Sequence, residues 1–186
     1  MRQFFIALCA LTFASVLAVS AQANDTLTIK LKDGDVVIKL AADVAPKHVK
    51  QITTLAKNGE YDNVAFHRVM EGFMAQTGDV EFGDMEDGYA ANRAGTGGSS
   101  LGDIEAEFSQ VPYERGTVGM ARSQNPNSAN SQFFIMFAEG AFLNGQYTVV
   151  GQVTSGMEFV DKIKRGSGQS GSVQDPDRMI SVTVSQ

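Results

Sequence analysis

The chain has 186 residues, with 21 acidic against 15 basic side chains and a net charge of −6. A net acidic chain is poorly suited to nucleic-acid binding, which needs clustered Lys and Arg against the phosphates. The single cysteine, Cys9, lies in the apolar N-terminal run, so the rest of the chain can form neither disulfides nor thiolate metal sites. The length fits one domain with a sizeable core.

The N-terminus carries the pattern of a secretory signal peptide. Arg2 precedes an uncharged apolar run over residues 4–19, and Ala21-Gln22-Ala23 matches an Ala-x-Ala cleavage site. The run is shorter than the roughly 20 residues that a membrane-spanning helix needs. We therefore expect residues 1–23 to be a cleaved signal peptide and residues 24–186 to be the functional domain. Retention as an anchor is the alternative, and the expected location is a bacterial periplasm, with secretion as second choice.

A β-hairpin and a helix are predicted to open the domain. Residues 27–31 alternate between apolar and polar, Asp33-Gly34 is a turn signal, and residues 36–40 form a second strand. Pro46 then suits the first turn of a helix. Apolar residues spaced three and four apart give that helix one apolar face, and Asn58-Gly59 ends it.

Residues 66–77 predict a tight hairpin with a Glu-Gly turn at its centre. Because side chains alternate faces along a strand, Arg68 shares a face with Met70, and Gln76 shares one with Met74. One guanidinium and one carboxamide would then lie beside apolar surface. That combination suits the polarisation of a carbonyl or amide. It does not suit hydrolysis, because no nucleophile or general base stands beside it.

The rest of the chain predicts a mainly antiparallel β fold. Residues 78–102 form a long loop rich in glycine and acids, and these acids, Asp79 among them, are expected to be solvated. Regular βαβ alternation is absent, and closure of the sheet into a barrel would remove its edges. The further elements expected are strands at 117–120, 133–137, 147–153 and 179–184, and a helix that begins near Met157 and is closed by Gly166.

Several blocks of sequence resemble, in order and spacing, the signature of the cyclophilins, which are peptidyl-prolyl cis-trans isomerases. The resemblance extends from about Thr26 to Val184. It implies a closed eight-stranded antiparallel β-barrel capped by two α-helices, and an isomerase that needs no cofactor and no metal. The blocks are Phe66-His67-Arg68, Gly72-Phe73-Met74-x-Gln76, Met120-Ala121 and Ser131-Gln132-Phe133-Phe134-Ile135.

The resemblance assigns roles to individual residues. Arg68 would donate to the twisted imide, an interaction that is stronger in the transition state than in the ground state and therefore raises the rate. Phe73, Gln76 and Phe134 complete the expected catalytic set. From pattern alone the apolar residues would be plain core, and Gln132 could equally be a buried structural amide. The expected substrate-binding residues are Met74, Gly97, Ala121, Arg122, Gln132, Phe142, Leu143 and Tyr147.

Two positions depart from the best-known family pattern. Phe142 stands where many eukaryotic members carry tryptophan, and Tyr147 stands where they carry histidine. Without the indole N–H, the chain lacks a donor that the inhibitor cyclosporin uses. We expect weak cyclosporin binding with activity kept, and nanomolar inhibition would contradict this.

The two histidines are not expected to be catalytic. His67 should point away from Arg68 into the packing, and His48 is expected to be solvated on the first helix. Two distant histidines without cysteines make a poor zinc site. The glycine-rich run at 95–100 lacks the third glycine of a dinucleotide fingerprint and the lysine of a Walker loop.

Three functions compete at this level. The first is a monomeric isomerase acting on proline-containing segments of unfolded or partly folded exported proteins, without nucleic acid or stable membrane association. The second is a binding module that grips such segments without useful turnover, for which a donor such as Arg68 would be unnecessary. The third, a serine hydrolase using Ser99 or Ser131, lacks a plausible histidine partner.

Overall fold

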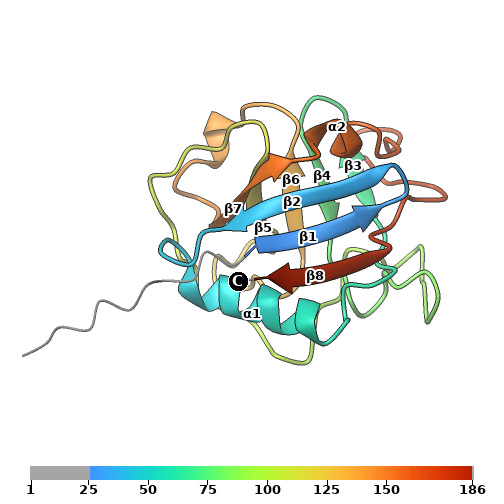
Figure 1. The fold of residues 1–186 in the computed structure, drawn as a ribbon, viewed down its shortest axis with the longest axis horizontal. Helices are drawn as coiled ribbons and strands as arrows, with labels where there is room; N and C mark the ends of the chain where they lie inside the picture. Colours follow the sequence, from blue (N-terminus) through green and yellow to red (C-terminus); the bar gives the residue numbers. More distant parts are fainter. Residues whose placement is uncertain (1–25, 186) are drawn as a thin grey trace, which may run out of the picture.

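The computed structural model describes residues 26–185, so the predicted signal peptide at 1–23 lies outside the described residues. The elements follow in chain order as strands with two α-helices and one 3-10 turn between them (Figure 1). They are β1 (Thr26–Leu31), β2 (Gly34–Leu40), α1 (Pro46–Lys57), β3 (Arg68–Met70), β4 (Met74–Thr77), β5 (Thr117–Met120), β6 (Phe133–Met136), η1 (Ala141–Leu143), β7 (Val149–Ser155), α2 (Met157–Val160) and β8 (Ser181–Ser185).

All eight strands form one antiparallel sheet in the order β3-β4-β6-β5-β7-β2-β1-β8. The predicted mainly β, antiparallel fold is confirmed. The predicted closed barrel overstates the structure, because within residues 26–185 the end strands β3 and β8 do not pair with each other. A single bridge between Ala65 and Arg178 joins the segments that precede them. The sheet is therefore a curled half-barrel, with β1, β2 and β8 in front of β3, β4 and β6 in Figure 1.

The core lies inside the curl of the sheet. Alternate residues of β1 and β2, such as Ile29, Val36 and Ile38, are fully buried. Helix α1 packs beside β8 and adds its apolar face, which includes Ile52 and Leu55, to the same core (Figure 1). The helix begins at Pro46, where a missing N–H removes no helical bond. The first hairpin and this helix match the prediction from the sequence.

The second helix is shorter than predicted, since α2 ends at Val160 rather than near Gly166. After Asp161 the backbone changes from bonds between residues four apart to bonds between residues three apart, which tightens the turn. The N–H of Gly166 then bonds the carbonyl of Val69 in β3 at 2.9 Å. The N–H of Gly166 is therefore bonded to a distant strand and not to a carbonyl of a longer α2.

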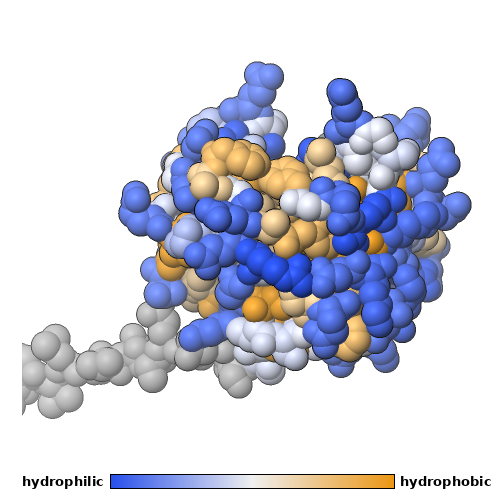
Figure 2. All heavy atoms as spheres, turned by 90° about the horizontal axis from the view of Figure 1, so that it is seen from above, coloured by the Kyte–Doolittle hydropathy of each residue, from blue (hydrophilic) through white to orange (hydrophobic). Residues whose placement is uncertain are grey.

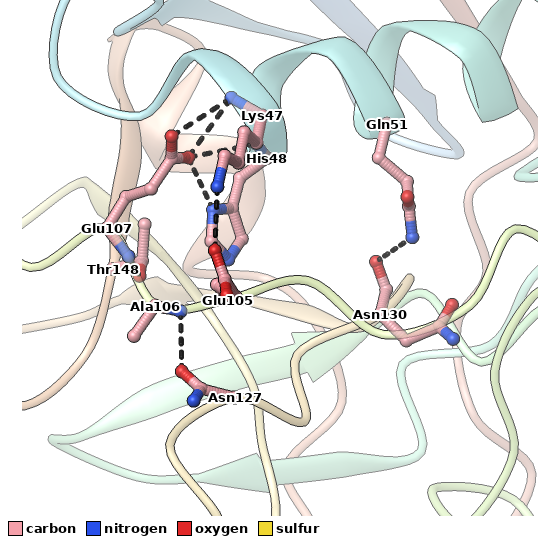
Figure 3. A network of polar contacts seen from close by, with 9 residues as sticks. All are labelled: Lys47, His48, Gln51, Glu105, Ala106, Glu107, Asn127, Asn130 and Thr148. Atoms are coloured by element: carbon pink, nitrogen blue, oxygen red, sulfur yellow. Dashed lines mark hydrogen bonds and ion pairs between the residues drawn. The ribbon is translucent and has the colours of Figure 1, made fainter.

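His48 is fully buried, so the prediction that it is solvated is wrong. Its Nδ1 lies 2.7 Å from Oε2 of Glu107, and the same carboxylate accepts the N–H groups of Lys47 and His48 in the first turn of α1 (Figure 3). Burial alone would raise the pKa of Glu107, but the bonds from His48 and the two backbone N–H groups lower it. The loop that supplies this carboxylate is distant in sequence, which is why local pattern did not reveal the pair.

On the face seen in Figure 2, apolar patches lie between hydrophilic side chains. Exposed large apolar side chains include Leu101, Phe108 and Phe142. Within residues 26–185, no helix has the length and apolar character needed to cross a lipid bilayer.

Candidate active site

Four neighbouring strands bring the predicted residues into one row. The register pairs Arg68 of β3 with Gln76 of β4, Gln76 with Phe134 of β6, and Phe134 with Gly119 of β5. Directly paired residues point to the same face of a sheet, so the guanidinium, the carboxamide and the phenyl ring share the outer face. The adjacent residues of these strands face the core instead; they are Val69, Ala75, Ile135 and Val118.

A hollow of about 300 Å³ opens on this outer face. Every residue that lines it was predicted from the sequence to be catalytic or substrate-binding. The lining residues are Arg68, Phe73, Met74, Gln76, Ala121, Arg122, Phe134, Phe142, Leu143 and Tyr147. The remaining two predicted residues, Gly97 and Gln132, line an adjoining hollow that shares Gln76, Ala121 and Arg122 with the first.

A slightly larger hollow, of about 340 Å³, lies elsewhere, between the turn after β1 and residues 176–180. None of the predicted site residues lines it. Its charged side chains are already paired, Lys32 with Asp177 at 2.6 Å and Arg178 with Glu86 at 3.1 Å. The chemistry predicted from the sequence therefore belongs to the smaller hollow beside Arg68.

The apolar part of the site rests on a small cluster that is separate from the main core. Met74, Phe134 and Leu143 belong to this cluster, and Phe73 packs against it. The ring of Phe134 stacks on Tyr113 with centroids 5.8 Å apart. This packing holds the Phe134 ring in place beneath the hollow.

Gly119 leaves the space that the Phe134 ring occupies. A Cβ atom on Gly119 would lie 2.6 Å from Cζ of Phe134 and would also meet the Tyr113 hydroxyl. That hydroxyl is buried without a hydrogen-bond partner in the described structure, and burial raises the pKa of Tyr113 above its ordinary value. The sequence did not single out either residue, because neither carries a motif of its own.

Neutral partners hold the guanidinium of Arg68 at the rim of the hollow. Nε donates to the carbonyl of Ser170 at 3.0 Å, Nη1 to Oε1 of Gln76 at 3.2 Å, and Nη2 lies 3.0 Å from Sδ of Met70. Within residues 26–185, no carboxylate lies within 4.0 Å of this guanidinium. Its positive charge therefore stays available to a bound group.

The two glutamines extend this network. Nε2 of Gln76 donates to Oε1 of Gln132 at 3.0 Å, and Nε2 of Gln132 donates to the carbonyl of Gly97 at 2.8 Å. Gln132 is therefore satisfied within the protein and also lines the adjoining hollow. The two readings that the sequence left open, structural amide and substrate contact, are compatible in this geometry.

Asp79 is fully buried, so the prediction that this acid is solvated is wrong. Its Oδ2 accepts the N–H groups of Gly95 and Gly97 at 2.7 and 2.9 Å, and its Oδ1 accepts those of Glu81 and Phe82. The carboxylate organises the glycine-rich loop from inside. A short polar loop must satisfy its backbone N–H groups, and here one buried acid satisfies four of them.

His67 is buried, as expected, with its ring against Gly95. Burial lowers the pKa of His67, and the nearby Asp79 carboxylate offsets part of that shift. His67 directly precedes Arg68, the first residue of β3, so the alternation of side chains along extended backbone turns it away from the hollow.

The opposite wall of the hollow carries aromatic rings and a second arginine. Phe142, from η1, is 65% exposed, and its ring centroid lies 5.5 Å from that of Phe73. The guanidinium of Arg122 lies 4.3 Å from the centroid of the Tyr147 ring. The positions that differ from the best-known family pattern, Phe142 and Tyr147, thus both belong to this wall.

Sequence reasoning missed the partners that come from distant loops. The segment around Ser170 holds Nε of Arg68, and Ser172 bridges to Arg68 as an isolated β pair. No local signal marks that segment. Met70 was recognisable, because it shares a strand face with Arg68. Among residues 26–185, no three His, Cys, Asp or Glu side chains gather as a metal ligand set.

Comparison with known proteins agrees with this geometry. The family model of the cyclophilin type peptidyl-prolyl cis-trans isomerases matches residues 26–184. A probable peptidyl-prolyl cis-trans isomerase of Brucella suis biovar 1 is 61% identical over 180 residues, which covers 96% of this chain and 92% of the relative. Peptidyl-prolyl cis-trans isomerase B of Escherichia coli K12 is 38% identical, over 86% of this chain and 99% of its own.

Solved structures give the same result. A cyclophilin-type isomerase of Cryptosporidium parvum, crystallised in the presence of the dipeptide Ala-Pro, superposes with a TM-score of 0.72 at 27% identity, covering 87% of this chain and 99% of that one. A cyclophilin of Hirschia baltica superposes with a TM-score of 0.72 at 25% identity, covering 86% and 73%. With the family model spanning nearly all described residues and the site residues gathered around one hollow, this chain belongs to the cyclophilin-type peptidyl-prolyl cis-trans isomerases.

Proposed function

We propose that this isomerase accelerates X-Pro isomerisation in exported proteins while they fold, in the periplasm, after loss of residues 1–23. The signal-peptide pattern of the N-terminus supports export, and the absence of cysteine from residues 24–186 suits an oxidising compartment. The clients are proline-containing segments of unfolded or partly folded chains, and the protein acts as a monomer.

The catalytic device that we propose is the Arg68 guanidinium at the rim of an apolar hollow. Uncatalysed isomerisation takes about 10–100 s. Shortening this to milliseconds requires roughly 10⁴–10⁵-fold acceleration, or about 5.5–7 kcal/mol off the barrier. No bond to the protein is needed. As the imide twists, its nitrogen gains a lone pair and its carbonyl loses conjugation. A fixed cation that donates to this nitrogen stabilises the twisted imide more than it stabilises the planar ground state.

The observation that carries this mechanism is the state of Arg68. It is half-buried, held by Ser170 and Gln76, and has no carboxylate beside it within the described residues. A guanidinium engaged only in a structural ion pair would have an acid partner. Neutral acceptors fix its position and leave its charge for the substrate.

The rest of the hollow would grip the substrate. Phe73, Met74, Phe134 and Leu143 offer apolar contact to the pyrrolidine ring, which removes the ring from water. Gln76 and the main chain of Ala121 lie beside the same hollow and offer hydrogen bonds to the flanking backbone. Holding the ring still while the preceding carbonyl turns is what rotation about one bond requires.

The test measures isomerisation of a short Ala-Pro peptide in a coupled assay with Arg68→Ala and Arg68→Lys. We expect Arg68→Ala to lower kcat/KM by about 10²-fold, the effect of removing one transition-state donor. The peptide affinity, measured by NMR titration, should change little. Arg68→Lys should restore only part of the rate, because an ammonium cannot reproduce the planar fork.

Arg93→Ala is the matched control. Arg93 is exposed, lies 3.5 Å from the centroid of the Phe82 ring and lines neither hollow of the site. Its loss should leave the rate unchanged. Full activity of Arg68→Ala would refute the mechanism. A wild-type protein that binds the peptide without turnover would instead support the binding-module reading. Cell fractionation, with sequencing of the mature N-terminus, tests the periplasmic location and the cleavage after Ala23.

A further inference from the structure

Arg122 stands on the wall between the two adjoining hollows of the site and lines both. Its guanidinium is fixed in position. Nε and Nη2 donate to the carbonyl of Gln146 at 3.3 and 2.9 Å, Nη1 donates to the carbonyl of Ser123 at 2.8 Å, and the group lies over the Tyr147 ring. The side chain of Arg122 is therefore ordered before a substrate binds, so binding does not cost the entropy of ordering it.

The charge of Arg122 is not neutralised by the protein. All its acceptors are backbone carbonyls, and no carboxylate of residues 26–185 lies within 4.0 Å of it. Nη2 carries two N–H groups and makes one bond, so one N–H is left for a ligand. In an acidic protein, this half-buried cation is well placed to contact a peptide beside the proline hollow.

The second hollow, about 270 Å³ in volume, has a polar, uncharged lining apart from Arg122. Its other side chains include Thr96, Ser123 and Asn130, and none is acidic. The buried Asp79 carboxylate lies behind Gly95 and Gly97 of this lining, but four backbone N–H groups engage it. The next hollow is lined by the acids Glu81 and Asp103. An anionic side chain therefore meets attraction close to the proline site and repulsion farther out.

We propose that this isomerase prefers prolyl segments with an aspartate or glutamate within three residues of the proline, whose carboxylate pairs with Arg122. Such a preference deepens the function proposed above and rests on the proline ring entering the hollow beside Arg68. An extended peptide advances about 3.3 Å per residue, so a residue within two or three of the proline reaches the second hollow. A partly exposed ion pair of this kind changes kcat/KM by about 1.5- to 5-fold.

The test uses peptides with one Ala-Pro bond and glutamate placed in turn at each of three positions before proline and two after. Each has a partner peptide with glutamine at the same place, which matches the shape without the charge. We expect a Glu/Gln ratio of kcat/KM of about 1.5 to 5 at one position for the wild-type protein at low ionic strength. High salt should reduce that ratio, because it screens a partly exposed pair.

Arg122→Gln should bring the ratio to about 1, and Arg122→Lys should keep part of it. Arg93 is exposed and lines neither hollow, so Arg93→Gln should leave the ratio as in the wild type. A ratio of 1 at every position, or a ratio that survives in a folded Arg122→Gln protein, overturns the proposal. The rate on the glutamine peptides reports separately on the isomerase itself, so loss of activity and loss of charge preference are distinguishable. Circular dichroism establishes that each variant is folded.

Discussion

Phe134 and Ile135 are neighbours on β6 but lie on opposite faces of the sheet. Ile135 faces the core, as do Val69, Ala75 and Val118 on the paired strands. Phe134 faces outward, in a row with Arg68, Gln76 and Gly119. The inner row is uniformly apolar, and its task is burial. The outer row mixes a cation, an amide, a ring and a glycine, which is a poor choice for packing and a good one for binding a proline.

Because side chains alternate between the two faces of these four strands, the residues that stabilise the fold lie on the inner face and the residues of the candidate site lie on the outer face. The inner face contributes burial, and its row of Val69, Ala75, Ile135 and Val118 carries no polar side-chain atom. The outer face carries a buried hydroxyl without a partner on Tyr113 and an arginine without an acid at Arg68. Both features reduce stability or leave it unimproved, and both lie at the site.

The largest expected effect tests that separation within one strand. Ile135→Ala should lower the free energy of unfolding by about 2–5 kcal/mol, because Ile135 is 1% exposed and its loss leaves a cavity. Its kcat/KM, measured where the variant is folded, should stay near the wild-type value. Urea unfolding and the coupled peptide assay measure the two quantities. A large loss of activity in a folded Ile135→Ala protein would break the comparison.

The next effect places a side chain on the outer row. Gly119→Ala puts a Cβ atom 2.6 Å from Cζ of Phe134 and closer still to the Tyr113 hydroxyl, so the stacked pair of rings must shift. We expect kcat/KM to fall by about tenfold, since small displacements of positioning groups have effects of 10- to 100-fold. Val118→Ala on the inner face of the same strand is the control, and it should reduce stability without this loss. Unchanged activity in Gly119→Ala would show that the placement of the stacked Tyr113 and Phe134 rings does not limit the rate.

The smallest expected effect is the pH dependence of the free energy of unfolding that the buried His67 produces. Burial lowers the pKa of His67, whereas the unfolded chain keeps the ordinary value of 6.5. Below pH 6.5 the unfolded state therefore binds a proton at His67 that the folded state does not bind. The free energy of unfolding should fall as the pH drops from 6.5 towards the folded pKa, and His67 should contribute nothing above that range.

Urea unfolding at pH 7.5 and at pH 5.5 measures this dependence. His67→Gln, which keeps a polar side chain that does not titrate, should show a weaker dependence on pH than the wild type. If both proteins lose the same stability over this range, the neutral buried histidine is not its source.

Much of the fold and of the site was predictable from the sequence. The 66–77 hairpin, with Arg68 and Gln76 on matching faces, follows from alternation and a turn, both of which are local. The first hairpin and the bounds of α1 follow from the same kind of signal. The residues that line the hollow were predicted from the family resemblance, because apolar residues such as Phe73 and Leu143 look like core residues by pattern alone.

The rest was decided by contacts between distant segments. Local periodicity says which face a side chain takes, but not which strand lies beside it, and only that choice brings Phe134 next to Gln76 and Gly119. Asp79 and His48 look like solvated residues in the sequence, yet the folded chain buries both. Backbone N–H groups of the glycine-rich loop bond the Asp79 carboxylate, and a carboxylate from a distant loop pairs with Nδ1 of His48. Burial and hydrogen bonding depend on what the folded chain brings near a residue, and this information lies in the tertiary structure alone.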